Sequence, residues 1–270
     1  MELETKAITI MPGTSQTHDS LNLCKRAVET HSTSCKASLL FLDNSCDNQA
    51  MRDHMEAYVE SFGYEYQYLD RPFSWTKFCN YGTTQVGRSF DYVNYSNADV
   101  VFHAGWLYYL LELWNQDDNR QKYFSVHPYA YSPQSGGHQG ENYRLTTEPD
   151  HSLVNCDHPL MHVSTFRKGD GFVWDEAFNL YNADCDFWMW LRMQGLTCAI
   201  GHSSRVDHVC GQIVNHIQEC SSGPVDLGGA SEFYEKWKVI LDIDKNKAEA
   251  DEIRDGLNTK LRNDKAGKCL

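Results

Sequence analysis

Residues 37–42 read A-S-L-L-F-L, an almost continuous apolar run that ends next to an acidic turn. This pattern is typical of a strand in a parallel sheet, because helices cover both faces of such a strand. Residues 7–11 (A-I-T-I-M) and 64–69 (Y-E-Y-Q-Y-L) predict two further strands, and residues 20–29 and 48–62 predict the helices between them. The order strand, helix, strand, helix, strand predicts an α/β domain of the doubly wound type, with functional loops at the carboxyl ends of the strands.

The rest of the chain continues the alternation, with one long irregular segment. Residues 128–159 are rich in Gly, Ser, Pro, Asn and His, and a segment of this length in a compact domain is typical of a lid or a binding loop, or else of a disordered segment. The residues from 231 onward are polar and helical in pattern, which indicates a peripheral helix or a surface for a partner. The other expected elements are helices at 78–85 and 106–115 and strands at 91–96, 123–126, 160–166, 197–201 and 206–209.

The composition is that of an acidic globular chain. Its 270 residues are 41% hydrophobic and carry a formal net charge of −13. This charge opposes a general surface for duplex nucleic acid or for anionic membranes, because both need a basic field. A local basic pocket for a phosphorylated ligand remains compatible with it.

The ten cysteines occur without a paired C-x-x-C spacing, which favours free thiols in a reducing compartment. Residues 1–6 are acidic and poor in apolar side chains, so we expect no signal peptide, and no apolar run has the length of a membrane span. We therefore expect a cytoplasmic protein. Peripheral attachment to a membrane is an alternative, and a viral chain would be located in the cytoplasm of the host cell. Cys156-Asp157-His158 lacks the second ligand pair of a zinc site, and we interpret the glycosylation sequon at Asn94 as chance.

Two phosphate-binding signatures are absent from the sequence. No G-x-G-x-x-G follows the first predicted strand, which opposes a dinucleotide cofactor. No G-x-x-x-x-G-K-S/T occurs either, which opposes a P-loop enzyme. A nucleotide would therefore be bound by other residues at the carboxyl ends of the strands.

Three polar segments with carboxylates follow predicted strands: Asp43 with Asn44 and Ser45, Asn97 with Asp99, and Asp184 with Asp186. Each alone is a common feature of loops. Together they could supply a partner for a base, a ligand for a divalent cation on a diphosphate, and a general base. Oxygen ligands and few protein groups suit Mg²⁺ or Mn²⁺ bound to phosphates.

The densest group of candidate catalytic side chains lies in residues 170–211. Asp184 and Asp186 stand where a helix is predicted to begin, and the helix is predicted to end before Gly195. A carboxylate at a helix entrance is kept ionised by the helix dipole, and beside apolar walls it suits a general base. Capping of an ordinary core helix is the alternative interpretation. The aromatic residues of this helix could stack on a sugar, although helical spacing assigns at least half of them to the core: Phe187, Trp188 and Trp190.

Several motifs, taken in order, resemble one known family. They are I-T-I-M-P-G (8–13), F-L-D-N-S-C-D-N (41–48), F-C-N-Y-G-T-T (78–84), N-A-D-V-V-F-H-A-G-W-L (97–107), the run from G-F-V-W-D-E to M-Q-G-L (171–196), R-V-D-H-V-C-G (205–211) and F-Y-E-K-W-K (233–238). This series resembles the inverting GT-A nucleotide-sugar glycosyltransferases of the family-2 type, which include bacterial rhamnosyl- and galactosyltransferase-like proteins. The resemblance covers about residues 8–211.

The resemblance implies a GT-A (Rossmann-like) α/β fold, with a mixed, mainly parallel sheet flanked by helices and a C-terminal helical tail. Residues 1–100 would form the half that binds the nucleotide-sugar donor. Residues 101–222 would form the acceptor and catalytic half of the same domain, and residues 223–270 a C-terminal helical extension.

The resemblance also implies roles for individual residues. Asp43 would accept a hydrogen bond from the pyrimidine base, Asp99 would bind the metal together with His208, and Asp184 would be the general base. The implied donor-binding residues are Pro12, Gly13, Thr14, Asp43, Asn44, Asn80, Asn97 and Ala98. The implied acceptor residues are Trp106, Asp175, Glu176 and Trp188.

The implied reaction is a single displacement that inverts the anomeric carbon of a nucleoside-diphosphate sugar, with a UDP-sugar favoured, Mn²⁺ or Mg²⁺ as cofactor, and a glycan or other hydroxyl as acceptor. Two residues depart from the family pattern, Asn97 at the first D-x-D position and Ala183 where Glu is usual. They leave open a non-catalytic nucleotide- or sugar-binding relative. A nucleotidyltransferase is a further alternative, but it predicts lysine in the first loop, and residues 11–17 (M-P-G-T-S-Q-T) contain none.

Overall fold

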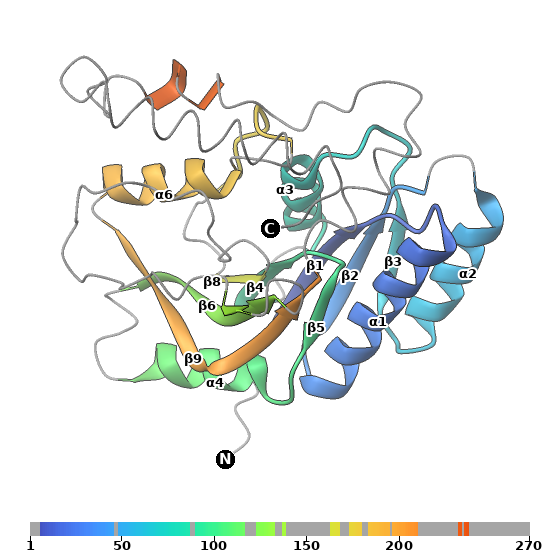
Figure 1. Cartoon of the computed structure of the whole chain (residues 1–270), viewed down its shortest axis with the longest axis horizontal. Coiled ribbons are helices and arrows are strands. Elements are labelled where there is room, and N and C mark those ends of the chain that lie inside the picture. Colours follow the sequence, from blue (N-terminus) through green and yellow to red (C-terminus); the bar gives the residue numbers. More distant parts are fainter. Residues whose placement is uncertain are drawn as a thin grey trace.

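In the computed structural model, the described residues form one mixed sheet with helices on both faces (Figure 1). Helices α1, α2 and α4 pack on one face, and α3 and α6 pack on the other. The structure describes residues 6–45, 48–86, 90–116, 123–132, 137–138, 163–167, 173–179, 183–194, 196–209, 232–233 and 235–237.

The strand order is β3-β2-β1-β4-β8-β6-β9-β5, with β7 paired to β6. Pairs β3–β2, β2–β1, β1–β4 and β6–β9 are parallel, whereas β4–β8, β8–β6, β6–β7 and β9–β5 are antiparallel. The strands are β1 (Ala7–Gly13), β2 (Ser38–Asp43), β3 (Glu65–Tyr68), β4 (Tyr92–Ser96), β5 (Val100–Phe102), β6 (Tyr123–Ser132), β7 (Gly137–His138), β8 (Val163–Arg167) and β9 (Thr197–His208). This is the expected α/β architecture.

Helices α1, α2 and α3 connect the parallel strands and begin at polar caps. The side chain of Thr17 accepts from the Ser20 N–H and forms a capping box with it at the start of α1, and Ser74 accepts from the Lys77 N–H at the start of α3. The cap at Ser74 explains why α3 begins one turn earlier than the expected residue 78. The helices are α1 (His18–Ser34), α2 (Gln49–Glu60), α3 (Trp75–Gln85), α4 (Trp106–Asn115) and α6 (Ala183–Gln194).

Two hydrophobic clusters, one on each face of the sheet, fix these helices. On one face, alternate residues of β2 such as Leu39 and Phe41 meet α1, α2 and α4. On the other, Leu40 and Leu42 meet α3, and the same cluster includes Phe187 of α6. Successive side chains of a strand point to opposite faces, so the continuous apolar run of residues 37–42 supplies both clusters at once.

Some strands differ from their predicted bounds. β1 continues through Pro12 and Gly13, where a turn was expected, because its pairing with β4 ends at Ile10 and a proline is tolerated where one side of a strand has no partner. β6 likewise passes Pro128 and reaches Ser132, with a register shift just after the proline. The predicted irregular segment 128–159 therefore begins as strand, and its residues 133–136 and 139–159 lie outside the described residues.

β9 is one strand, although two short strands were predicted at 197–201 and 206–209. Pro128 of β6 pairs with Gly201 of β9, and the next residue, Tyr129, pairs with Arg205. Residues 202–204 of β9 therefore form a bulge. β5 was not predicted from the sequence; it pairs with β9 and sets Val100 opposite His208. Asn94 is fully buried in β4, which agrees with the interpretation of its sequon as chance.

Candidate active site

The carboxylate of Asp43, at the end of β2, organises the first part of the candidate site. It is fully buried, and it accepts hydrogen bonds from the Ser15 N–H at 3.2 Å, the Ser15 hydroxyl at 2.7 Å, the Ser45 hydroxyl at 2.5 Å and the Tyr66 hydroxyl at 2.8 Å. Burial and the charge of Asp43 raise the pKa of Tyr66, so this phenol stays protonated and donates. The four bonds join β2 to β3 and to the loop after β1.

A carboxylate has about four lone-pair positions, so these four bonds use the whole accepting capacity of Asp43. A pyrimidine base that donated to Asp43 would take the place of one of the hydroxyls. The predicted contact between Asp43 and the base stays a prediction, and Ser15, Ser45 and Tyr66 are partners that the sequence analysis did not assign.

Gly13 and Ala98 meet at the carboxyl ends of β1 and β4. A Cβ atom placed on Gly13 would lie 2.9 Å from the Cβ of Ala98 and 2.7 Å from the ring of Phe41, so a larger residue does not fit there. Register pairs Gly13 with Asp43, and the Asn44 N–H donates to the Gly13 carbonyl at 3.1 Å. The fold thus brings together the first loop, the D-N-S turn and the N-A-D loop.

The side chain of Asn44 holds a fourth segment at the same edge. Its amide donates to the carbonyl of Leu69 at 3.1 Å and to that of Arg71. The guanidinium of Arg71 lies 4.9 Å from the ring centroid of Tyr81. Thr14 donates to the Asn44 carbonyl at 3.4 Å, so the loops after β1, β2 and β3 form one connected surface. We call residues 12–15, 43–45 and 97–99 the donor edge.

Asp99 and His208 are in contact at the end of the donor edge, with 3.3 Å between Asp99 Oδ1 and His208 Nε2. Each side chain is only 4% exposed. The pairing of β5 with β9 explains the contact, because Val100 lies opposite His208 and the Val209 N–H donates to the Asp99 carbonyl at 2.9 Å. The two residues predicted as metal ligands are therefore adjacent.

The fit of this pair to a divalent cation depends on its donor set. Within the part of the chain that the structure describes, Asp99 Oδ1 is buried and has no hydrogen-bond partner besides its 3.3 Å contact with His208 Nε2. No group of three His, Cys, Asp or Glu side chains among these residues could hold a metal ion. One carboxylate and one imidazole are suitable ligands for Mn²⁺, and the oxygens of a bound diphosphate would have to supply others. The pair fits a cation that arrives with a nucleotide.

The second part of the candidate site is the segment 173–179, which is fixed to α3. Asn80 accepts from the Trp174 N–H at 2.9 Å and donates to the Trp174 carbonyl at 2.8 Å. Thr76 donates to the Phe178 carbonyl at 2.8 Å, and the Trp75 N–H donates to the Asn179 carbonyl at 2.7 Å. Asn80 was predicted to bind the donor, but the structure uses both of its amide atoms to hold segment 173–179.

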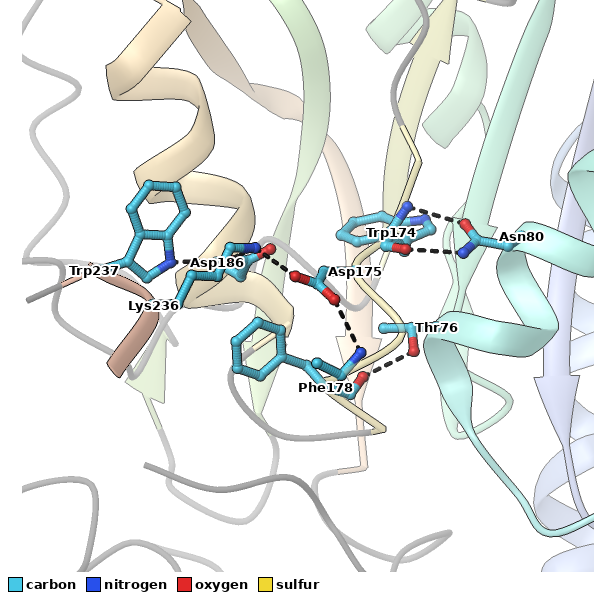
Figure 2. A network of polar contacts seen from close by, with 9 residues as sticks. Thr76, Asn80, Trp174, Asp175, Phe178, Asp186, Lys236 and Trp237 are labelled. Atoms are coloured by element: carbon cyan, nitrogen blue, oxygen red, sulfur yellow. Dashed lines mark hydrogen bonds and ion pairs between the residues drawn. The ribbon is translucent and has the colours of Figure 1, made fainter. Parts of the chain in front are cut away.

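Lys236 joins that segment to the first turn of α6 (Figure 2). Its ammonium lies 2.5 Å from Asp175 Oδ2 and 2.6 Å from Asp186 Oδ1, and the Trp237 indole N–H donates to the same Asp186 oxygen at 2.9 Å. The Ala177 N–H donates to the other oxygen of Asp175 at 2.9 Å. We call Asp175, Asp186, Lys236 and Trp237 the acceptor network, after the acceptor role that the sequence predicts for Asp175.

The pKa values in this network follow from burial and from the shared ammonium. Burial raises the pKa of Asp186, and the hydrogen bonds from Lys236 and Trp237 only partly offset this rise. Partial burial acts in the same direction on Asp175, but Lys236 and the Ala177 N–H outweigh it, so its pKa lies below the ordinary value. Burial acts to lower the pKa of Lys236, yet its two carboxylate partners raise it overall, and the ammonium remains charged.

Asp184, the predicted general base, lies in the first turn of α6 and is half-buried. Its Oδ1 accepts from the Cys185 N–H at 2.9 Å, a position in which the helix dipole favours the ionised carboxylate. Phe187 is a core residue, since it is 1% exposed and lies 5.6 Å from the ring of Trp174. The ring of Trp190 is stacked on Phe187, so these two aromatics pack rather than present a free platform.

Two predicted acceptor residues are not brought to this network. Trp106 is fully buried in α4 on the other face of the sheet, 4.9 Å from the ring of Phe102, so its position is that of a packing residue. Glu176 is exposed and accepts from Asn80 at 3.1 Å, next to the network but not in it. The side chain of Trp188 lies outside the described residues.

Lys236 was not assigned a role from the sequence. The F-Y-E-K-W-K motif was its only signal, because the two carboxylates that it meets lie 61 and 50 positions earlier, and one sequence shows no such pairing. No helix among the described residues has both the length and the apolar character that a bilayer crossing requires.

No family model matches the chain, and no curated protein matches it by sequence. Solved structures do match. S. aureus TarS 1–349 gives a TM-score of 0.55 at 10% sequence identity, over 79% of this chain and 63% of that one. The same protein in complex with UDP gives 0.56 at 10% identity, over 80% and 65%. A crystal structure of S. aureus TarS gives 0.53 at 10% identity, over 79% and 38%.

The chain thus spans less than two thirds of the length of these structures. At this level of identity the likeness concerns the fold. It shows that the chain has the mixed α/β fold of GT-A glycosyltransferases, as expected from the sequence.

Proposed function

We propose that this chain is a glycosyltransferase that moves a sugar from a nucleoside-diphosphate sugar, with UDP favoured, to an acceptor hydroxyl. The observation that carries the proposal is the donor edge. In a GT-A fold, the contact of Gly13 with Ala98 places the first loop beside the N-A-D loop, and Asp99 meets His208 at the same edge. A similar structure, that of S. aureus TarS 1–349, was determined with UDP, which supports the choice of nucleotide.

The donor edge would bind the nucleotide through backbone groups and buried side chains. Asp43 keeps the first loop in place through its bonds to Ser15, and the small residues Gly13 and Ala98 allow the backbone to approach a ligand closely. Preorganised groups of this kind bind a transition state without rearrangement, which is the usual source of electrostatic catalysis. The proposed donor residues are thus held before the donor arrives.

Asp99 and His208 would hold Mn²⁺ or Mg²⁺, which when bound neutralises charge on the diphosphate leaving group. Both side chains are buried and adjacent, so they need little movement to bind. Asp184 would take the proton of the acceptor hydroxyl as its oxygen attacks the anomeric carbon. Its place in the first turn of α6 keeps the carboxylate ionised and therefore able to act as a base. One attack from the face opposite the leaving group gives inversion.

A second candidate is a binding protein without transferase activity. Two features favour it: Asn97 and Ala183 replace acidic residues of the family pattern, and the described residues contain no three-residue metal group. In this case the donor edge would bind nucleotide, but no sugar would be released. The two candidates therefore differ in turnover and agree in binding.

The test is a screen of UDP-, GDP- and dTDP-sugars with Mn²⁺, in which thermal shift reports binding and released nucleoside diphosphate reports turnover. A bound ligand raises the apparent stability by mass action. We expect a UDP-sugar to raise the Tm and to be consumed slowly even with water as acceptor. Binding without release of UDP in any acceptor mixture would favour the binding protein, and no shift with any nucleotide would contradict both candidates.

A further inference from the structure

Lys236 forms charged contacts with two segments at once (Figure 2). Asp175 belongs to segment 173–179, whereas Asp186 belongs to the first turn of α6, two residues after the proposed base. The ammonium lies 2.5 Å from one carboxylate and 2.6 Å from the other. Charge-assisted contacts at such distances are among the stronger polar interactions in proteins.

The contribution of Lys236 differs from that of its neighbour Trp237. The Trp237 indole already attaches the C-terminal segment to Asp186 at 2.9 Å, and its side chain is largely buried against α6. Lys236 is therefore not needed merely to attach that segment. What Lys236 adds is the second contact, to Asp175, and with it a fixed distance between segment 173–179 and α6.

Segment 173–179 is also held in place by α3 and by packing of Trp174. On its far side, Asn80 and Thr76 bind its backbone to α3. Trp174 is buried, with its ring 4.9 Å from that of Trp75 and 5.6 Å from that of Phe187. The segment is therefore held between α3 and α6, and its one charged contact toward α6 in the described residues is that of Asp175 with Lys236.

Of the three charged groups only Asp186 is buried, and its burial distinguishes this bridge from an ion pair that lies wholly at the surface. The side chain of Asp186 is 8% exposed, and those of Asp175 and Lys236 are 35% and 36% exposed. The ammonium also lies 5.4 Å from the ring of Phe178 and 5.1 Å from that of Trp237, within the range of cation–π attraction. Without Lys236, two carboxylates would face each other, one of them in a buried position, and would move apart or take up a proton.

We infer that Lys236 is a positioning residue for sugar transfer: it sets the segment that carries Asp175, at the acceptor side, against the helix turn that carries the base Asp184. This inference rests on the proposed function and adds to it a residue that touches neither donor nor reacting atoms. Catalysis between two bound groups depends steeply on their geometry, and a displacement of about 1 Å can lower a rate by about 100-fold.

The test compares Lys236→Met, Lys236→Gln and Lys236→Arg with wild type, and uses Lys77→Met as the matched control because Lys77 is an exposed lysine of the neighbouring α3. We expect Lys236→Met to lower kcat for transfer by about 10-fold or more. Its KM for the UDP-sugar should stay within about twofold, since the donor edge is unchanged. Hydrolysis of the donor by water should persist, so the ratio of hydrolysis to transfer should rise.

Lys236→Arg should recover most of the transfer rate, because a guanidinium can also bind two carboxylates. Lys236→Gln should not recover the transfer rate, because a neutral amide does not hold two carboxylates together. This variant replaces Lys236→Met in the test if the methionine variant fails to fold.

Three results would overturn the inference: wild-type kcat in folded Lys236→Met or Lys236→Gln, no recovery in a folded Lys236→Arg, or a loss shared equally by transfer and hydrolysis. A wild-type protein that consumes no nucleotide sugar would instead overturn the proposed function. The two failures are therefore distinguishable in one set of assays.

Discussion

The donor edge and the acceptor network are built in opposite ways. The donor edge consists of short turns directly after parallel strands, so neighbouring residues in sequence, such as Gly13 and Thr14 or Asp43 and Asn44, are also neighbours in the site. The acceptor network is built from segment 173–179, the first turn of α6 and residues 236–237, which meet only in the folded chain. Each loop of the donor edge is therefore a short local motif, and the parallel pairing of β1 with β2 and β4 brings these loops together. The acceptor network depends instead on the packing of segments that no strand pairing aligns.

The difference predicts that donor binding and transfer can be separated by substitution. Changes at the donor edge should alter nucleotide affinity. Changes in α6, segment 173–179 and the acceptor network should alter the rate of transfer or the acceptor KM while nucleotide affinity persists.

The largest expected effect is that of Asp184→Asn. An amide cannot take the acceptor proton, and loss of a general base lowers rates by about 10²- to 10⁴-fold. Binding of UDP should stay within about twofold, because Asp184 lies in α6 and not at the donor edge. Steady-state transfer and calorimetric UDP binding measure the two quantities. Asp53→Asn, at an exposed position of α2, is the control. Normal transfer by Asp184→Asn would remove the base assignment.

Gly13→Ala should act on the opposite region. Its new Cβ would lie 2.7 Å from the Phe41 ring and 2.9 Å from Ala98, so the loops after β1 and β4 must move apart. Overpacking of this kind costs about 1–3 kcal/mol. We expect a lower free energy of unfolding in urea and weaker UDP binding. Gly63→Ala is the contrasting variant, because Gly63 has no neighbour within 4 Å of such a Cβ and would report only the cost of its positive φ of 73°. Equal affinity for UDP in Gly13→Ala and wild type would contradict a contact between the first loop and the donor.

Asn80→Ala should affect the acceptor side and leave the donor edge unchanged. It removes both hydrogen bonds to the backbone of Trp174, and two unpaired buried groups cost about 1–3 kcal/mol each at most. We expect a raised acceptor KM with an unchanged KM for the UDP-sugar. If Asn80→Ala weakened donor binding instead, the role predicted from the family resemblance would be correct.

The smallest effect concerns pH. The pKa of Asp175 lies below its ordinary value of 3.8, so its contribution to stability is present above that pH and is lost as pH falls below it. The raised pKa of Asp186 has the opposite sign and offsets part of this loss, because the fold favours its protonated form. Lys236 has a raised pKa, so its contribution is present below 10.5 and is lost as pH rises further. The difference in unfolding free energy between wild type and Lys236→Met should therefore be largest between these limits, and urea titrations across pH would show it. A constant difference would contradict the bridge.

The comparison also explains what could be predicted from the sequence. Apolar runs that suit strands are local signals, so the α/β order could be predicted from the sequence. The pairing of Asp99 with His208 was expected only from the family resemblance. The fully occupied carboxylate of Asp43 was not expected, because Tyr66 reaches it only through the register of β2 and β3.

On the acceptor side, the position of Trp106 could not be predicted from the sequence. It follows the N-A-D motif closely in sequence, which suggested a role at the acceptor, but α4 turns its indole into the core of the other face. Lys236 shows the reverse, since nothing near it in sequence indicates that it meets Asp175 and Asp186. Residues brought together by packing of distant segments are seen only in the structure.

The central claim is that the donor edge binds a nucleoside diphosphate together with a divalent cation held by Asp99 and His208. Titration calorimetry of UDP with Mn²⁺ and with EDTA, on wild type and on Asp99→Asn, tests it directly. We predict binding to wild type with Mn²⁺, at least about 10-fold weaker binding when EDTA removes the cation, and no dependence on Mn²⁺ in Asp99→Asn. Equal UDP affinity in all four titrations, or no binding in any, would contradict the claim.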